Sequence, residues 1–375
     1  MASSSLPEEL VEEILVRLPQ DDPVHLVRAS LVCKSWRRVL SDQDCFLRRC
    51  RGFHGAAPPL LGYFAINRCY GNDATQFVPA TSTASPVRVP AVDHRRRWFL
   101  PVDCRHGRVL IHYEDRDRST KRGFVVWDPL TGSRQHLGMP SASYPSHSCR
   151  YTSYTGAVVC AKAGCDDDHL DCQAGPFRVV CVETNLLKPV FACATSYSSV
   201  TGAWSAPVPN HDSHDFNYYC LRSYGKQSLL VGDAVYFLFQ DDQSILRYDL
   251  GRHRLSEIGM PPAMCNTALM KTEGGGLGLA ALPNNNRIHI WSRHDEDGCW
   301  VEHRVVELET LLPRRMRNRY HRVVGSAEGT NTVFVNVCNT IFMLDVKSNK
   351  VRKFSKRKSG QFEYILPYLR FYAPS

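Results

Sequence analysis

The chain has 375 residues, of which 46 are Lys or Arg and 37 are Asp or Glu, so that its formal net charge is +9. Apolar residues make up 43% of the sequence, which is typical of globular proteins and excludes wholesale disorder. A secretory signal needs a basic start and an apolar run, but this chain begins with the acidic residues Glu8, Glu9, Glu12 and Glu13, and no stretch approaches the ~20 apolar residues that span a bilayer. We therefore expect a protein of the cytoplasm, the nucleus or both, whose fifteen cysteines are reduced thiols.

The first predicted element is an amphipathic helix that ends near residue 18. Leu10, Ile14 and Leu18 recur at a spacing of four and so share one face, while glutamates fill the other face. Pro7 suits the first helical turn, where its missing N–H group would have no partner in any case. Pro19 disfavours continuation of the helix.

Two more short helices are predicted before residue 42. In "DDPVHLVRAS" Asp22 is a suitable cap and Pro23 a suitable first residue, and a third helix runs from about Leu31 to Leu40. The three helices hold too few apolar residues to close a core, because domains of about forty residues generally depend on a metal, a disulfide or a partner. We therefore expect exposed apolar surface that docks either on the remainder of this chain or on another protein.

The segment "LPEELVEEILVRLP…LVRASLVCKSWRRVLSD" resembles an F-box, whose pattern is Leu-Pro, an acidic amphipathic helix, a second Leu-Pro and a Val-Cys-Lys-x-Trp helix. The resemblance covers about residues 5–50 and implies docking on the Skp-type adaptor of a cullin-RING ubiquitin ligase. The residues that it assigns to this contact are Leu6, Pro7, Leu10, Ile14, Leu18, Val32, Cys33 and Trp36. Trp36 would be the anchor, because aromatic side chains commonly dominate interfaces. The neighbouring Lys34, Arg37 and Arg38 either face the acidic adaptor or are solvated.

After Arg51 the pattern changes to short runs rich in Val, Ile, Phe and Tyr, divided by Gly, Asn, Asp and Pro, which indicates an all-β domain. The stretch "WDPLTGSRQHLGMP" at 127–140 matches "YDLGRHRLSEIGMP" at 248–261. Asp128 then corresponds to Asp249, and Gly-Met-Pro ends both stretches. Such internal similarity is typical of repeat folds.

Six repeat units lie near residues 60–85, 98–140, 156–209, 225–262, 267–312 and 321–356. At ~40–50 residues per four-stranded blade, residues 52–375 would form a β-propeller of six to eight blades, with six favoured. The final segment "FEYILPYLRFYAPS" would pair with the first unit and close the ring. A pair of β-sandwiches is the alternative.

The expected fold class is therefore α+β and multidomain, with a three-helix F-box at residues 5–50 and an all-β propeller at residues 52–375. An F-box ahead of a strand-rich repeat domain resembles the large plant group of F-box proteins with kelch-like or F-box-associated propellers.

Few residues suggest chemistry. The segment "CAKAGCDDDHLDC" contains Cys160, Cys165, His169 and Cys172, but their spacing fits no tight Cys-x-x-Cys pair, and we expect a solvated surface loop in place of a zinc or calcium site. The glycine-rich "EGGGLGLA" at 273–280 lacks the Lys of a phosphate-binding loop and is predicted to be a turn. No serine lies in a nucleophile elbow. We therefore expect no metal, no cofactor and no catalytic site.

The sequence thus predicts a non-catalytic substrate-recognition subunit of a Skp-cullin-F-box (SCF) ubiquitin ligase, which positions a target protein for other subunits. The alternative is a propeller that binds carbohydrate or a small ligand, with accessory helices. Membrane binding is not expected, and nucleic-acid binding is less favoured, since no reader motif accompanies the basic patches.

A target would bind on the propeller rim turned away from the adaptor, because binding residues tend to lie on loops held by a rigid scaffold. The segment "LPRRMRNRYHR" lies among the candidate loops, and its arginines either bind acidic or phosphorylated segments or are simply solvated. These arginines are Arg314, Arg315, Arg317 and Arg319.

Overall fold

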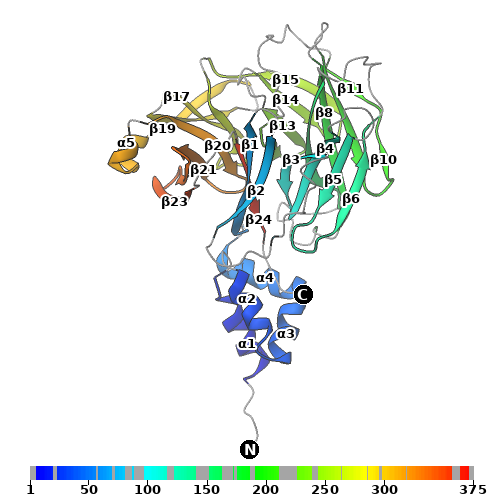
Figure 1. Cartoon of the computed structure of the whole chain (residues 1–375), viewed down its shortest axis with the longest axis vertical. Coiled ribbons are helices and arrows are strands. Elements are labelled where there is room, and N and C mark those ends of the chain that lie inside the picture. The colour runs from blue at the N-terminus through cyan, green and yellow to red at the C-terminus, as the bar shows by residue number, and fades with distance from the viewer. Residues whose placement is uncertain are drawn as a thin grey trace, which may run out of the picture.

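The computed structural model describes residues 6–19, 23–55, 58–69, 72–80, 87, 97–115, 122–140, 152–162, 172, 175–185, 191–210, 226–238, 244–262, 264–284, 286–294, 298–317, 319–356 and 364–370. Figure 1 shows a small bundle of helices below a ring of β-sheets. The predicted fold class is confirmed, since a helical N-terminal part precedes an all-β propeller of six blades. In the part of the chain that the structure describes, no helix has the length and the apolar character needed to cross a membrane.

The N-terminal bundle has four helices, α1 (Glu8–Val16), α2 (Pro23–Ser30), α3 (Lys34–Ser41) and α4 (Gln43–His54). Pro7 lies just before the first turn of α1 and Pro23 begins α2, as the sequence predicts. The fourth helix is not among the predicted ones. Asp42 caps it, because the Asp42 Oδ1 atom accepts a hydrogen bond from the backbone N–H of Cys45 at 3.4 Å.

The helix bundle has a core of its own. The buried residues come from all four helices and are Val11, Leu15, Val16, Leu26, Ala29, Val39, Leu40, Phe46, Leu47 and Cys50. The expectation that the helices are too poor in apolar residues to close a core is therefore wrong. The physical reason is α4, which adds Phe46, Leu47 and Cys50 to the contribution of the three predicted helices. Among the described residues, none from the strands belongs to this core.

The blades are antiparallel sheets that follow one another along the chain. Blade 1 contains β1 (Leu60–Cys69), β2 (Asn72–Pro79) and β24 (Tyr364–Leu369). Blade 2 contains β3 (Arg97–Arg105), β4 (Arg108–Asp115), β5 (Arg122–Trp127) and β6 (Arg134–Gly138). Blade 3 contains β7 (Thr152–Cys160), β8 (Phe177–Asn185), β9 (Phe191–Ser198), β10 (Ala203–Trp204) and β11 (Val208–Pro209).

Blade 4 contains β12 (Leu229–Val231), β13 (Ala234–Leu238), β14 (Ser244–Asp249) and β15 (Arg254–Gly259), blade 5 contains β16 (Thr267–Lys271), β17 (Leu277–Asn284), β18 (Arg287–Arg293) and β19 (Trp300–Glu307), and blade 6 contains β20 (His321–Ala327), β21 (Thr332–Val337), β22 (Thr340–Asp345) and β23 (Lys350–Lys356). A short helix α5 (Leu308–Leu311) and a 3₁₀ turn (Arg314–Met316) connect blade 5 to blade 6. The six predicted repeat units are confirmed as the six blades.

The last described strand closes the ring. β24 pairs antiparallel with β1, from Leu60 opposite Leu369 to Ile66 opposite Tyr364, on the side of β1 that β2 leaves free. It also contacts β3 and β20, the first strands of the two neighbouring blades, and so occupies the innermost position of blade 1. The predicted pairing of the final segment with the first unit is confirmed. This closure removes an exposed edge at the centre of the propeller.

Strand direction divides the propeller into two rims. The backbone N–H of Arg370, just after β24, donates to the carbonyl oxygen of Pro59, just before β1, at 3.1 Å. The Arg370 Nη1 atom donates to the Gly107 carbonyl oxygen in the turn between β3 and β4 at 3.4 Å and to Asp128 Oδ1 after β5 at 2.6 Å. These turns therefore lie at the end where the helices join, which we call the helix-side rim. The opposite end is called the far rim, and it holds the connection between blades 5 and 6.

The repeated sequence stretches correspond to repeated contacts. Asp249 and Asp345 end the third strands of blades 4 and 6, and Asp128 directly follows the third strand of blade 2. The Oδ1 atom of each Asp accepts hydrogen bonds from the backbone N–H groups two and three residues later, at 2.7–3.2 Å. The three carboxylates thus fix the outer turns on the helix-side rim.

The glycines of the two Gly-Met-Pro sequences bind the next blade. The carbonyl oxygen of Gly138 accepts a hydrogen bond from the Trp204 indole N–H at 2.9 Å, and that of Gly259 accepts one from Trp300 at 2.8 Å. Trp204 lies in blade 3 and Trp300 in blade 5, so the same contact joins blades 2 and 3 and blades 4 and 5.

Candidate functional site

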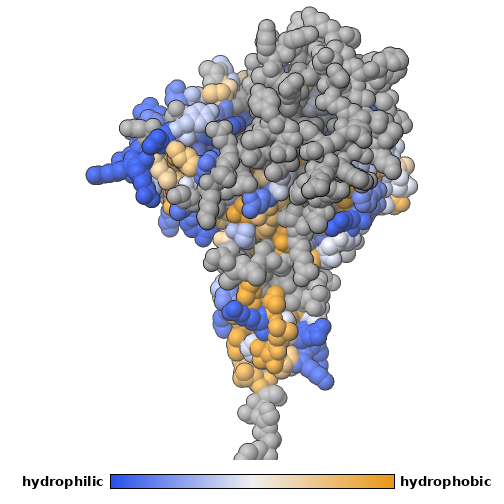
Figure 2. Space-filling model, in the orientation of Figure 1, coloured by the Kyte–Doolittle hydropathy of each residue, from blue (hydrophilic) through white to orange (hydrophobic). Residues whose placement is uncertain are grey.

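The helix bundle keeps several large apolar side chains at its surface although its core is closed. The exposed fractions are 51% for Leu6, 47% for Leu10, 42% for Ile14, 79% for Leu31 and 61% for Val32. We call these five residues the apolar helix face. Figure 2 shows hydrophobic residues gathered over the middle of the helix bundle, with hydrophilic residues at its right-hand edge. Clustered, exposed apolar side chains of this kind mark interaction surfaces.

The geometry of α1 explains why part of its apolar side stays outside. Successive residues of a helix are rotated by about 100°, so that Leu10 and Ile14 form a row beside the row of Val11 and Leu15. Val11 and Leu15 are 2% and 0% exposed and point into the helix core. Phe46 of α4 fills that core from another side and is itself buried. The outer row therefore stays about half exposed at the bundle surface.

The structure separates the predicted adaptor-binding residues into two groups. Pro7 and Cys33 are exposed, like the predicted members of the apolar helix face. Leu18 and Trp36 are instead partly buried and pack against the helix core. Truncation of Trp36 would therefore remove packing inside the bundle as well as any contact outside it.

Leu31 is an exposed apolar residue that the sequence analysis does not include among the candidate contacts. We assigned it to the third helix, but it lies in the turn between α2 and α3, where it is the most exposed large apolar residue described. The available signal is the run of apolar residues at 31–33, which breaks helical periodicity. Of the basic residues beside this run, Arg38 forms an ion pair with Glu8, so part of that positive charge is compensated within the bundle.

The four arginines predicted to bind a target lie on the far rim, between blades 5 and 6. The side chains of Arg314, Arg315 and Arg319 are exposed. Arg317 is half-buried, and its Nε–H donates to the carbonyl oxygen of Leu312 at 3.2 Å. Arg317 therefore holds the loop, while the other three present their guanidinium groups to solvent.

Three further features attach this loop to the propeller. Leu312 is 2% exposed, and Met316 packs against the core between blades 5 and 6. The His321 Nε2 atom lies 2.9 Å from the Met316 carbonyl oxygen, within hydrogen-bonding distance. The loop is thus anchored at its start, middle and end, which gives the exposed arginines defined positions.

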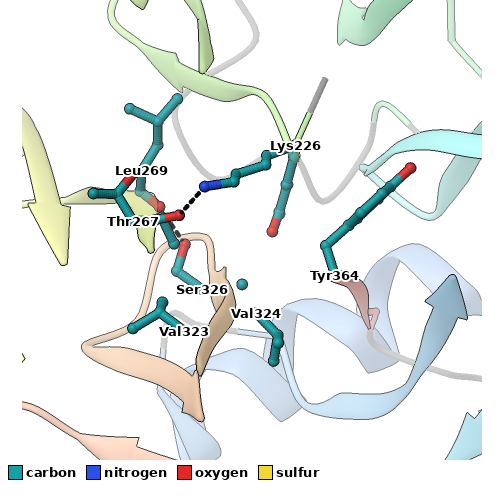
Figure 3. A pocket seen from close by; sticks show the side chains of 10 residues that line it. Lys226, Thr267, Leu269, Val323, Val324, Ser326 and Tyr364 are labelled. Atoms are coloured by element: carbon teal, nitrogen blue, oxygen red, sulfur yellow. Dashed lines mark hydrogen bonds between the residues drawn. The ribbon is translucent and has the colours of Figure 1, made fainter. Parts of the chain in front are cut away.

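A pocket lies where the inner strands of blades 4, 5, 6 and 1 approach the centre of the ring (Figure 3). Lys226 Nζ donates to the Thr267 carbonyl oxygen at 3.0 Å, and Ser326 Oγ donates to the Leu269 carbonyl oxygen at 2.5 Å. The buried Gln227 Oε1 atom, which also lines this pocket, makes no hydrogen bond within the described part of the chain. The space suits roughly one water molecule, far less than the ~300 Å³ of a typical ligand site, so this pocket does not favour the small-ligand alternative.

A buried ionic cluster fills the helix-side end of the central channel. The Arg105 Nη1 atom donates to Asp103 Oδ2 at 2.7 Å, Nε donates to Glu328 Oε2 at 2.7 Å, and Nη2 donates to the Ser228 carbonyl oxygen at 2.9 Å. Asp103 also accepts hydrogen bonds from the Ser228 hydroxyl at 3.0 Å and from the Val158 N–H at 2.8 Å. The cluster thus joins blades 2, 3, 4 and 6.

The protonation of this cluster is set by opposing effects. Burial raises the pKa of Asp103 to about 6, against the positive charge of Arg105, which lowers it. Asp103 is therefore ionised at pH 7 and its charge is compensated by Arg105. The described members of the cluster satisfy one another, and the cluster closes one end of the channel without presenting a reactive group.

The other sequence candidates contribute no site within the described residues. Cys160 ends β7 and Cys172 is buried, while Cys165 and His169 lie outside the described residues. The glycine-rich segment forms a turn between β16 and β17, as predicted, with the Thr272 N–H donating to the Gly276 carbonyl oxygen at 2.9 Å. Nowhere in the described part do three or more His, Cys, Asp or Glu side chains come together to hold a metal ion.

Several solved structures resemble this chain at low sequence identity. A protein of unknown function from Bacteroides caccae has a TM-score of 0.46 and 8% identity, and the match covers 82% of this chain and 99% of that one. YCF48 bound to a D1 peptide has a TM-score of 0.42 and 10% identity, with 84% and 94% covered. The nidogen/laminin complex has a TM-score of 0.41 and 13% identity, with 82% and 97% covered. Among curated proteins, none matches the chain.

Two family models match the two parts of the molecule. The F-box domain model matches residues 3–48, which include the apolar helix face. The model described as "F-box protein AT5G49610-like, beta-propeller" matches residues 101–375, which include most of blade 2, all of blades 3 to 6 and the closing strand β24. Because the second match covers well over half of the chain, this F-box protein belongs to the AT5G49610-like β-propeller family.

Proposed function

We propose that the chain is the substrate-recognition subunit of an SCF ubiquitin ligase. The helix bundle would bind a Skp-type adaptor and, through it, the cullin and RING subunits, while the propeller at residues 52–375 would bind a target protein. The chain would act without a catalytic site, in the cytoplasm or nucleus, because its contribution is to hold the target near the subunits that transfer ubiquitin.

The apolar helix face is the observation that carries this proposal. The bundle closes its own core, so the exposed residues are not needed for folding. Full burial of a Leu or Ile side chain contributes about 1.5–3 kcal/mol, and Leu10 and Ile14 leave 47% and 42% of their surface exposed. Burial of the remainder under a partner would then contribute about 0.6–1.4 kcal/mol for each residue.

The target would bind on the far rim, because the helix bundle and its adaptor would occupy the opposite end of the propeller. Arg314, Arg315 and Arg319 are the proposed first contacts, since their exposed guanidinium groups can bind carboxylates or phosphates in a bidentate manner. Arg317, which the sequence groups with them, would act by holding the loop.

The test of the proposal is the affinity of the full chain for a purified Skp-type adaptor, measured by isothermal titration calorimetry. Leu10→Asp combined with Ile14→Asp should weaken binding by about thirty- to a thousand-fold, as loss of central interface residues commonly does. Val301→Asp combined with Val305→Asp is the matched control, because these β19 valines are each 41% exposed but lie on the propeller.

The control pair should leave the adaptor affinity unchanged, and circular dichroism should show that both variants keep the wild-type secondary structure. Unchanged affinity in the helix-face variant would overturn the proposal. Equal loss of affinity in the two variants would do so as well, because the adaptor contact would then not be specific to the helices.

A further inference from the structure

Most of the net charge of the chain comes from one region. Residues 312–356 contain ten Lys and Arg residues and two acidic residues, and so contribute +8 to the formal net charge of +9. All of these basic residues except Arg322 form two runs, one in the loop before blade 6 and one in and before its outermost strand β23. The runs lie at 314–319 and 347–356 and are separated by nearly thirty residues in the sequence.

The fold brings the two runs to one seam between blades 5 and 6. Met316 from the loop and Val351 from β23 pack against the same apolar core. Lys353 lies on the same face of β23 as Val351, because alternate residues share a face and the pairing with β22 is regular there, Val351 opposite Leu344 and Lys353 opposite Phe342. In Figure 1 α5, β19 and β23 gather at the left edge of the propeller, where Figure 2 shows a largely hydrophilic surface.

Four exposed cations of this seam have no ion-pair partner among the residues that the structure describes. The side chains of Arg314, Arg315, Arg319 and Lys353 are exposed, and none forms an ion pair with another described residue. The nearest acidic residues along the chain are already engaged. Glu307 pairs with Arg287 at 2.8 Å, and Glu309 accepts a hydrogen bond from Asn286 at 2.5 Å.

We propose that this basic seam, consisting of Arg314, Arg315, Arg319 and Lys353, binds a carboxylate-rich segment of the target protein. The inference rests on the proposed function, which assigns the far rim to the target. These cations are spread over a loop and a strand. They therefore suit a row of separate side-chain carboxylates better than one multiply charged group. Tyr320 lies directly after Arg319, at the start of blade 6, and is 65% exposed. Its ring adds an apolar surface for the stems of acidic side chains.

Fluorescence anisotropy of the full chain with a labelled twelve-residue glutamate-rich peptide tests the seam. Arg314→Glu, Arg315→Glu and Arg319→Glu together should weaken binding by ~tenfold or more, and Lys353→Glu alone by ~twofold to fivefold, because exposed ion pairs each contribute modestly. The matched control combines Arg134→Glu, Arg252→Glu and Arg254→Glu, which reverse three exposed arginines on blades 2 and 4. The control should bind the peptide like the wild type, and the wild-type affinity should fall as salt rises.

Several results would contradict the proposed role of the seam. The control variant could lose as much peptide affinity as the seam variant, or a glutamine-rich peptide could bind as tightly as the glutamate-rich one. Tighter binding of a phosphoserine peptide or of duplex DNA at the same salt concentration would also contradict it. Adaptor affinity, measured on the same variants, separates this inference from the proposed function. If the adaptor binds and the acidic peptide does not, the seam fails alone; if the peptide binds and the adaptor does not, the ligase role fails while the acidic ligand of the seam remains.

Discussion

Replacement of Arg105 by Met should destabilise the propeller strongly at neutral pH. The variant leaves Asp103 and Glu328 in the central channel without the cation that lies 2.7 Å from each of them. Removal of one partner from a buried ion pair costs about 3–5 kcal/mol. The lower end applies here, because the Glu328 side chain is 20% exposed and Asp103 keeps its bonds from Ser228 and Val158. For a propeller of the size of residues 52–375, about 3 kcal/mol corresponds to a fall in melting temperature of about 4–5 °C.

The loss should depend on pH in a defined direction. Burial already raises the pKa of Asp103 to about 6, and removal of the Arg105 charge raises it further. Between this raised pKa in the folded variant and the ordinary pKa near 4 in the unfolded chain, the folded variant binds a proton that the unfolded chain does not bind. The free energy of unfolding of the variant therefore increases as pH falls through this range. The stability deficit of Arg105→Met should therefore shrink from pH 7 to pH 5.

Urea unfolding followed by tryptophan fluorescence at pH 7 and pH 5 measures both effects. Asp103→Asn added to Arg105→Met should recover part of the loss at pH 7, because it removes one of the two unpaired charges. A deficit below about 1 kcal/mol at pH 7, or a deficit that does not change with pH, would refute the reasoning, since a buried unpaired charge predicts both.

Three further predictions concern single contacts. Burial lowers the pKa of His112 to about 4, so between about pH 6.5 and 4 the unfolded chain binds a proton that the folded chain does not. The wild type therefore loses stability on acidification through this range. Urea unfolding at pH 7 and 4.5 should show a smaller loss in His112→Phe. Gly107→Ala should lower the free energy of unfolding by about 2–3 kcal/mol, because φ is +72° and the new Cβ would lie 2.9 Å from the Arg370 side chain. Gly232→Ala, with φ +53° and no atom within 4 Å of the new Cβ, should lower it by only about 1 kcal/mol. Equal losses in the two variants would contradict the close approach at Gly107. Trp300→Phe should cost about 1 kcal/mol through its lost indole hydrogen bond, and a thermal melt equal to that of the wild type would show that the bond contributes nothing.

The propeller could be predicted from the sequence because its signals are local. Each blade is a series of short apolar strands between turn residues, and Asp128 and Asp249 mark equivalent turns. The predicted unit at residues 225–262 contains the whole of blade 4, from β12 to β15. Closure by β24 was also predictable, because a final apolar segment without a partner needs an edge to pair with.

The helix bundle was less predictable because its outcome depends on packing. Leu10 and Val11 are adjacent and similarly apolar, and the packing of the other helices against α1 decides that Val11 is buried while Leu10 stays outside. α4 itself is hard to predict from the sequence, because its arginines interrupt the apolar pattern around Phe46 and Cys50. A single sequence carries no signal for such a choice between neighbouring faces.

The basic seam could not be predicted for a different reason. Arg314 and Lys353 belong to two separate basic runs, and periodicity within either run says nothing about their distance in space. Their meeting follows from the order of strands in blade 6, which places β23 outermost and the preceding loop at the end of the same seam. Long-range proximity of this kind becomes visible only in the folded chain.

The pairing of β1 with β24 also sets the order in which the two halves of the molecule can be completed during synthesis. Leu60 leaves the ribosome about 300 residues before Tyr364, which at roughly 5–20 residues per second is a delay of about 15–60 s. During this time the helices, whose core needs no residue of the strands, can fold, whereas β1 has no inner neighbour and the ring stays open. A nascent chain would thus present its apolar helix face before it has a finished far rim, and newly made chains would meet the helix partner earlier than any ligand of the closed propeller.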